Sequence, residues 1–319
     1  MRICYSKRTE MPRLLRVLIP IWVIAFLSES CGDISFDGTA NDVPTAGQVK
    51  IGFEPGDSFL VSQWLYIFHS QYPKASVTPV FKEKEELVAL MLKDSLQGIF
   101  IHDKFSKSEQ NWLSDKKNAT VNEIAIGKTA PVFIASKESV IKGINFFDKE
   151  LWGNNGISRL IVRKRMCSEE QSIHRFVRSI CADSQEFKQH PYVQLRRESL
   201  PSDKEIVEYV SNHSDAVGII SLNTVADKRD SLSVALQRMV RILPVQNEKG
   251  DYRLPFQSQL SAKQYPIIQP ITSYETQGYS GLVKGFVIYA NSQSGQALLQ
   301  KSGLIPANYQ GRKIQIDLN

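Results

Sequence analysis

From residue 47 onward, apolar and polar residues alternate in blocks that predict strands followed by helices. The expected strands cover residues 49–53, 76–81 and 98–102. The expected helices cover residues 58–72, 83–92 and 106–113, and the last begins on Ser106 with Glu109 at capping-box spacing. Strands that alternate with helices of this kind are typical of parallel βαβ units. The first half of the chain is therefore predicted to form an α/β lobe.

The order of elements changes after residue 121. We expect strands at 122–126, 131–136, 160–162, 216–221, 265–272 and 313–316. We expect helices at 146–152, 169–181, 204–211, 282–290 and 295–301, and a polar region without assigned elements from 222 to about 260. Two α/β lobes joined by two crossings would enclose a ligand cleft. Ligands of such sheets bind beyond the carboxyl ends of the strands, where helix N-termini offer free N–H groups.

The length agrees with two domains, since the chain has 319 residues and is 42% apolar. One stretch, residues 17–27, is apolar enough to be considered as a membrane segment. Arg13 and Arg16 precede it, and small residues follow it. Eleven helical residues rise only about 16 Å, which is too short for a bilayer. The segment is typical of a secretory signal, for which Met11 fits the initiator better than Met1.

Cys31 lies where a bacterial lipoprotein signal places its lipidated cysteine. Ser28 occupies the position three residues earlier, where such signals usually have Leu. Ordinary cleavage or an uncleaved anchor is therefore the alternative. We predict a signal peptide at 1–30, lipidation of Cys31, and a flexible tether at 31–47 that holds the protein at a membrane of the cell envelope.

Charge and cysteine content narrow the function further. Residues 1–30 contain five basic and two acidic side chains, so the remaining chain carries 34 against 31, a net charge of +3. This weak excess does not indicate a nucleic-acid partner. Cys167 and Cys181 flank a predicted helix of about 20 Å, too long for a disulfide, so we expect two buried free thiols.

Known catalytic and metal motifs are missing from the sequence. The five histidines are dispersed without an i,i+4 pair, and no cysteine pair has C-x-x-C spacing. No G-x-S-x-G, H-E-x-x-H, Walker or G-x-G-x-x-G motif occurs. We therefore predict no metal, no cofactor and no enzymatic activity.

Five segments give the chain a specific resemblance. They are 49–59, 99–109, 205–220, 265–270 and 285–307, the last of which closes with Lys301-Ser302-Gly303-Leu304-Ile305-Pro306. In this order they resemble the PstS-type phosphate-binding lipoproteins, particularly the short versions found in Bacteroidetes. The resemblance implies a two-lobed α/β fold of the type II periplasmic-binding-protein class with two hinge strands. It also implies a discontinuous first lobe, 48–129 plus 264–319, and a second lobe, 130–263, with hinges near 131–134 and 267–271.

The resemblance suggests two ligand residues in the first lobe. Ser58 opens a helix after Gly56 and Asp57, where its hydroxyl and the helix N–H groups can bind an anion; the alternative is a plain helix cap. Asp103 follows the third strand at the place of an aspartate in phosphate-binding members. Its carboxylate would accept a hydrogen bond from protonated phosphate and repel sulfate; the alternative is a solvated loop residue.

Two further ligand residues are expected in the second lobe. Ser172 and Arg175 match the family pattern of a hydroxyl-rich helix start with a nearby arginine clamp. Ile173 stands where the family has Thr, and Glu169 and Glu170 add negative charge where the anion would lie. The clamp could instead be Arg163 or Arg165, and the helix could simply be a surface helix with ordinary charges.

The resemblance implies an envelope lipoprotein that captures inorganic phosphate or a related oxyanion for import through an envelope transporter. Such a receptor would close its two lobes around the anion by hinge motion. The departures at Glu169, Glu170 and Ile173 support an alternative of another class. In that alternative, the chain is a scaffold or interaction lipoprotein that keeps the binding-protein fold without the anion site.

Overall fold

The computed structural model describes residues 42–153, 156–164 and 167–308. Several sequence predictions lie outside these residues: the signal peptide at 1–30, Cys31, residues 31–41 of the tether, Arg165 and the strand at 313–316. In the described part of the chain, no helix has both the length and the apolar character that a membrane span requires.

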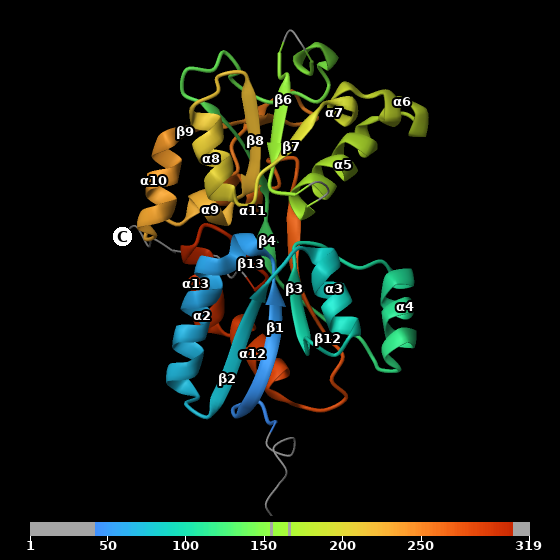
Figure 1. The fold of residues 1–319 in the computed structure, drawn as a ribbon, viewed down its shortest axis with the longest axis vertical. Coiled ribbons are helices and arrows are strands. Elements are labelled where there is room, and N and C mark those ends of the chain that lie inside the picture. Colours follow the sequence, from blue (N-terminus) through green and yellow to red (C-terminus); the bar gives the residue numbers. More distant parts are fainter. Residues whose placement is uncertain (1–41, 154–155, 165–166, 309–319) are drawn as a thin grey trace, which may run out of the picture. The chain divides into compact units, whose positions relative to one another are not determined.

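The first sheet has six strands in the order β13-β4-β12-β3-β1-β2 (Figure 1). They are β1 (Gly47–Phe53), β2 (Ala75–Phe81), β3 (Gly98–Ile101), β4 (Asn122–Thr129), β12 (Gln269–Glu275) and β13 (Ile305–Pro306). β1 is parallel to β2 and β3, whereas β12 is antiparallel to β3 and β4. The parallel half confirms the βαβ pattern of the sequence, and the antiparallel half uses strands from the end of the chain.

Helices connect these strands. They are the short η1 (Pro55–Asp57), α2 (Ser58–Gln71), α3 (Lys84–Leu92), α4 (Lys107–Lys117), α12 (Leu282–Asn291) and α13 (Gln293–Lys301). The capping box of Ser106 and Glu109 is present at the start of α4, as predicted, although this helix continues to Lys117. The predicted pair of closing helices is also confirmed.

The second sheet has five strands in the order β7-β6-β8-β5-β9. They are β5 (Pro131–Ser136), β6 (Arg159–Val162), β7 (Arg197–Ser199), β8 (Ala216–Ser221) and β9 (Val240–Leu243). The associated helices are η2 (Lys149–Leu151), α5 (Ser168–Ile180), α6 (Ser184–Gln189), α7 (Pro191–Gln194), α8 (Asp203–Ser211), α9 (Asn223–Ala226) and α10 (Ser231–Met239). A separate hairpin of β10 (Val245–Gln246) and β11 (Tyr252–Arg253) precedes α11 (Gln257–Ser261).

The chain passes between the two sheets at neighbouring points. Ala130 alone separates β4 from β5, so the first passage is a single extended segment. The chain returns between α11 and β12, and Gln269 at the start of β12 pairs with Thr129 at the end of β4. Because the two passages are paired strands, they form a narrow connection about which two lobes can move. The lobe boundaries at 129, 130, 263 and 264 stay a prediction.

Two predictions of local structure are wrong. The expected helix at 146–152 is only a single turn, η2, because Asp148 and Trp152 on either side of it have extended backbone conformations. The region from 222 to 260, expected to lack elements, contains α9, α10, β9, β10, β11 and α11. These elements have two to nine residues each, which is too short to produce a clear period in the sequence.

Cys167 and Cys181 are both free, as predicted. They lie at the two ends of α5, which separates them along the helix axis. Cys167 is buried, whereas Cys181 is only half-buried, so the expectation of two buried thiols holds for one of them.

The core of the first lobe is built around Phe286 of α12. Its ring contacts four other aromatic rings edge-on, with centroids 5.3–6.3 Å apart: Phe53, Trp64, Phe68 and Phe100. These residues come from β1, α2 and β3, so one side chain ties the closing helix to the first βαβ unit. Edge-to-face contacts of this kind add to the free energy gained by burial.

Phe286→Ala should lower the free energy of unfolding by about 3–5 kcal/mol, because it leaves a cavity in the aromatic core. Denaturant unfolding followed by fluorescence would measure the change. Ile288→Ala on the same helix is the control, since Ile288 is 58% exposed and its loss should cost no more than about 0.5 kcal/mol. Equal losses for the two variants would contradict this account of the core.

Candidate functional site

A buried arginine lies at the centre of the contact between the two lobes. Arg163 follows β6, and its guanidinium donates to three carboxylates: to Glu83 at 2.7 Å, Asp203 at 2.8 Å and Glu169 at 2.9 Å. Glu83 belongs to the first sheet's lobe, whereas Glu169 and Asp203 belong to the same lobe as Arg163. All four side chains are buried, so the ion pairs are shielded from water.

Each of these carboxylates lies at the start of a helix. Glu83 is the N-cap of α3, Glu169 is in the first turn of α5, and Asp203 begins α8. Helix starts carry partial positive charge and bind anions. Here the anions that occupy them are the protein's own carboxylates, which also surround Arg163.

A second buried group lies beside the first and also joins the lobes. The Glu54 Oε1 atom accepts hydrogen bonds from the backbone N–H of His102 and from the Ser168 hydroxyl, both at 2.8 Å. The His102 Nε2 atom lies 2.9 Å from Asp57, and Asp57 accepts a hydrogen bond from the Asn223 amide. Ser168 and Asn223 come from the second lobe, so Glu54, His102 and Asp57 are held from both sides.

Burial and charge shift the acid–base behaviour of this group. Burial raises the pKa of Glu54 to about 7, even though the neighbouring His102 lowers it. Burial alone would lower the pKa of His102, but Asp57 and Glu54 raise it to about 10. His102 is therefore a cation at neutral pH. Burial also raises the pKa of Glu83 against the effect of Arg163.

Glu169 and Arg163 behave as an ion pair. Burial would raise the pKa of Glu169, but Arg163 and His102 outweigh it and lower the pKa below its ordinary value. Burial would lower the pKa of Arg163, yet Glu169, Asp203 and Glu83 hold it well above its ordinary value. Both groups stay charged throughout the physiological range.

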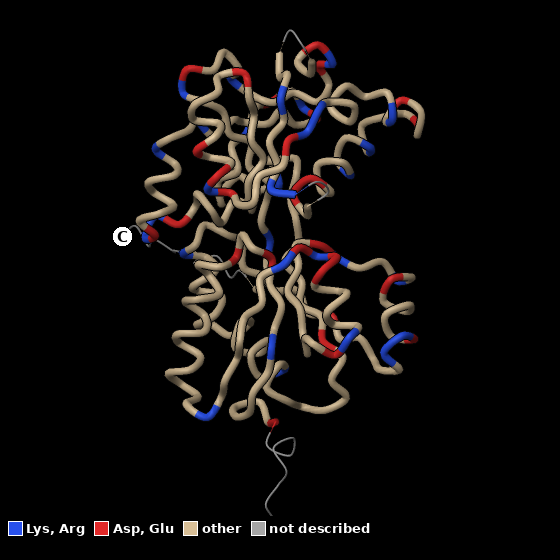
Figure 2. Tube along the Cα trace, in the orientation of Figure 1, with Lys and Arg blue, Asp and Glu red and all other residues tan. Residues whose placement is uncertain are grey.

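Among the buried charged groups at the lobe contact, each lobe has an excess of acid. The first contributes Glu54, Asp57 and Glu83 against His102, and the second contributes Glu169 and Asp203 against Arg163. Figure 2 shows acidic and basic positions close together at the starts of α3 and α5. Separating the lobes would remove only Glu83 from Arg163, because Glu169 and Asp203 move with it. The arginine therefore has no spare charge for an anion in either state.

The predicted ligand residues do not meet at one point. Asp103 and Arg175 do come together across the lobes, with an Arg175 nitrogen 3.2 Å from the carboxylate. Lys84 donates to the same carboxylate at 2.6 Å. Ser172 is buried, and its hydroxyl donates to the Glu169 carbonyl within α5. Ser58 is exposed at the start of α2.

Ser58 lines a cavity of about 390 Å³ that contains neither Asp103 nor Arg175. Arg163, Asp203 and Thr224 also line it, and the Thr224 hydroxyl donates to Asp203. The ligand role of Ser58, Asp103, Ser172 and Arg175 stays a prediction. Of the alternative clamps, Arg163 is central to the lobe contact, and Arg165 lies outside the described residues.

Sequence reasoning missed the first-lobe members of the buried group. Glu54 and His102 directly follow β1 and β3, so both lie at the carboxyl edge of one parallel sheet. Parallel strands bind ligands at that edge of a sheet, so the positions of Glu54 and His102 directly after their strands could have predicted this group. The negative charge of Glu169 was recognised from the sequence, but its partner Arg163 was considered only as an alternative clamp.

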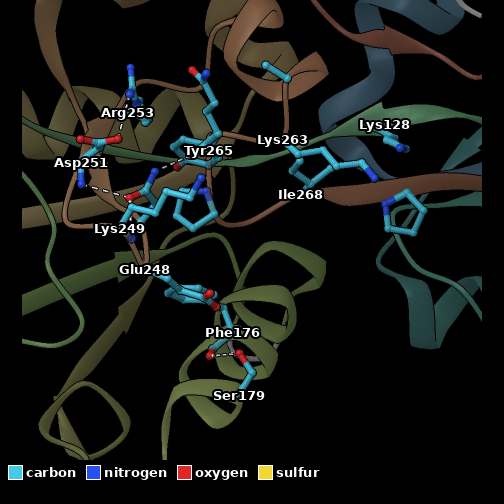
Figure 3. A pocket seen from close by; sticks show the side chains of 15 residues that line it. Lys128, Phe176, Ser179, Glu248, Lys249, Asp251, Arg253, Lys263, Tyr265 and Ile268 are labelled. Atoms are coloured by element: carbon cyan, nitrogen blue, oxygen red, sulfur yellow. Dashed lines mark hydrogen bonds and ion pairs between the residues drawn. The ribbon is translucent and has the colours of Figure 1, made fainter.

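Figure 3 shows a larger cavity, of about 850 Å³, beside the passages between the lobes. Lys128, Lys249 and Lys263 approach it from three segments, while Arg253 pairs with Asp251 at 2.9 Å. Phe176 of α5 forms an apolar wall. Because the three lysines are exposed to water, an ion bound by them would gain little, and this cavity is a weaker candidate than the buried cluster.

Comparisons with solved structures support the fold. A putative phosphate ABC transporter substrate-binding protein from Clostridium perfringens, solved with phosphate bound, has a TM-score of 0.63 at 14% identity over 82% of this chain and 99% of that one. An ABC-type phosphate transport receptor from Vibrio cholerae has a TM-score of 0.58 at 12% identity over 82% of this chain and all of the other, 100%. No protein-family model matches the chain, and no curated protein matches it in sequence.

These similarities confirm the predicted fold class, a two-lobed type II periplasmic-binding-protein fold with two hinge strands. At 12–14% identity they establish the architecture alone. What the site does must therefore follow from the side chains of this chain.

Gly56 of η1 lies against Ser221 at the end of β8, where the lobes approach closely. A Cβ atom on Gly56 would lie 2.6 Å from the Ser221 Cβ. Gly56→Ala should therefore push the lobes apart, and small-angle X-ray scattering should record a larger radius of gyration. Gly278→Ala is the control, because its Cβ would have nothing within 4 Å. Superimposable scattering from the two variants would contradict this close approach.

Proposed function

We propose that this chain is a non-enzymatic interaction lipoprotein of the cell envelope that uses the architecture of solute receptors without capturing free phosphate. The observation that carries the proposal is the state of Arg163, which already binds Glu83, Glu169 and Asp203. The site between the lobes thereby serves the contact of one lobe with the other. The envelope location rests on the predicted signal peptide and on Cys31.

Electrostatics oppose an oxyanion in this site. A phosphate brought to Arg163 would have to displace at least one carboxylate, or else lie among several buried negative charges. An unpaired buried charge costs several kcal/mol after relaxation, in general estimates. Opening the lobes does not remove the difficulty, since Glu169 and Asp203 stay with Arg163. The cluster is therefore better suited to joining the lobes than to binding an anion.

A receptor for phosphate or a related oxyanion, serving an envelope importer, is the second candidate. One observation favours it: Lys84 and Arg175, from opposite lobes, share the single carboxylate of Asp103. This rim group has a net positive charge, and the Arg175 side chain is 52% exposed. An anion could join it, with Asp103 accepting a hydrogen bond from the hydroxyl of a protonated phosphate. The two solved structures described above are also phosphate-transport proteins by their names.

Equilibrium dialysis of the purified protein with labelled phosphate separates the two candidates. We expect no saturable binding at phosphate concentrations up to about 1 mM. A dissociation constant of that size corresponds to a binding free energy of only about 4 kcal/mol. Saturable one-to-one binding at micromolar phosphate would overturn the proposal in favour of the receptor. In that case Arg175→Gln should weaken phosphate binding, whereas Arg178→Gln should not, because Arg178 lies on the same helix but donates to Ser184 and packs over the Phe187 ring.

A gain-of-function variant tests the reason for the absence of binding. Glu83→Gln combined with Glu169→Gln removes two of the three charges that neutralise Arg163. Phosphate binding by this variant should become at least about tenfold stronger than that of the unchanged protein. Dialysis would measure the change.

Glu85→Gln combined with Glu86→Gln is the matched control, because it removes the same number of negative charges near the lobe contact, at positions in the first turn of α3 that contact Gln171 and Lys164 instead of Arg163. Equal phosphate binding by the two double variants would show that the carboxylates around Arg163 are not what excludes the anion.

A further inference from the structure

A continuous row of buried polar groups runs from one lobe through the other and back. It starts at Ser168 in α5, passes through Glu54, His102 and Asp57 of the first lobe, and ends at Asn223 in α9. None of these five side chains is more than 7% exposed. The row exists only when the lobes are together, because its two ends belong to the second lobe.

Glu54 is the carboxylate in this row that has an oxygen without a hydrogen bond in the described structure. Its Oε1 atom accepts two hydrogen bonds, but its Oε2 atom is buried without a hydrogen-bond partner in the described structure. His102 Nδ1 lies 3.6 Å from Oε2 and has no hydrogen-bond partner among the described residues either. An ionised carboxylate with one oxygen left without a hydrogen bond is costly to bury, and protonation removes the charge that accounts for most of that cost.

Negatively charged groups lie near Glu54 on both lobes, although His102 beside it is positive. Asp57 of η1 shares His102 with it, and Glu169 of α5 approaches from the other lobe. Glu83 before α3 and Asp203 of α8 lie around Arg163, which they share with Glu169. Five carboxylates thus face two cations, His102 and Arg163. Neutralising one carboxylate would bring the closed site closer to balance.

We propose that Glu54 takes up a proton as the lobes close, so that the contact between them is a latch that acid strengthens. This inference rests on the proposed function, because it treats the interlobe site as a contact between lobes. Opening would return water to Glu54, remove Ser168 and Glu169, and release the proton. The chemistry requires no ligand other than the proton.

The direction of the pKa shift agrees with this geometry. The pKa of Glu54 is raised from 4.5 to about 7 in the closed structure, mainly by burial. A carboxyl group with a raised pKa in the closed form favours closure when it is protonated. Closure should therefore be strongest below about pH 4.5–5 and weaken as the pH rises to about 7. Over that interval the ratio of closed to open molecules should fall by up to about tenfold per pH unit. His102, with a pKa of about 10, keeps its charge throughout.

Small-angle X-ray scattering of the full protein in phosphate-free buffers from pH 5 to pH 8.5 tests the latch. The radius of gyration of the unchanged protein should increase with pH. Glu54→Gln mimics the protonated acid and should remove this dependence, remaining compact at pH 8. Glu86→Gln is the control, since Glu86 also pairs across the lobes, with Lys164, but is exposed, and it should keep the dependence.

If Glu54→Gln does not fold, a second variant still tests the latch. Ser168→Ala removes the hydroxyl that binds the ionised carboxylate, so the pKa of Glu54 should rise further and the transition should move to higher pH. A radius of gyration that is constant with pH in the unchanged protein, or an undiminished dependence in folded Glu54→Gln, would overturn the latch. Neither result bears on phosphate binding, which the dialysis experiment decides separately.

Discussion

The sharing of one guanidinium among three carboxylates from two lobes is the interaction on which this structure depends. Arg163 has donors in a rigid planar fork, and each of Glu83, Asp203 and Glu169 occupies a different nitrogen. Such a group is costly to bury and costly to break, because removing any one partner leaves charge without compensation. It therefore specifies a single closed arrangement of the lobes more than it adds net stability.

The residues around the Arg163 cluster also pack closely where the two lobes meet. Gly56 leaves room for Ser221 only because it has no side chain. At the rim, Lys164 pairs with Glu86 and Gln171 donates to Glu85, so the first turn of α3 meets the first turn of α5 and the segment before it. These exposed contacts are individually weak, but they place the buried group in register.

Local sequence patterns predicted most of the fold, and long-range pairing explains what they did not predict. Apolar runs such as 98–101 and the capping box at Ser106 depend on only a few neighbouring residues, so the sequence predicts them directly. The structure confirms both. Arg163 and Glu83 are 80 positions apart in the sequence, so no local pattern of residues predicts that they pair. Asp103 and Arg175 were predicted together only through a family resemblance. The short elements between residues 222 and 260 were not predicted, because they contain too few residues to show a clear helical or strand periodicity.

The same fold can serve opposite electrostatic purposes, so fold similarity and site chemistry must be weighed separately. Backbone geometry brings the starts of α3, α5 and α8 together, and that arrangement alone favours negative charge. Side chains determine whether that negative charge comes from a bound solute or from the protein itself. The TM-score compares backbone positions and does not measure side chains. In this chain Glu83, Glu169 and Asp203 supply it, two of them on the arginine's own lobe. A solute anion would therefore compete with tethered carboxylates that lose little translational freedom on binding, and such a competition favours the carboxylates at ordinary solute concentrations.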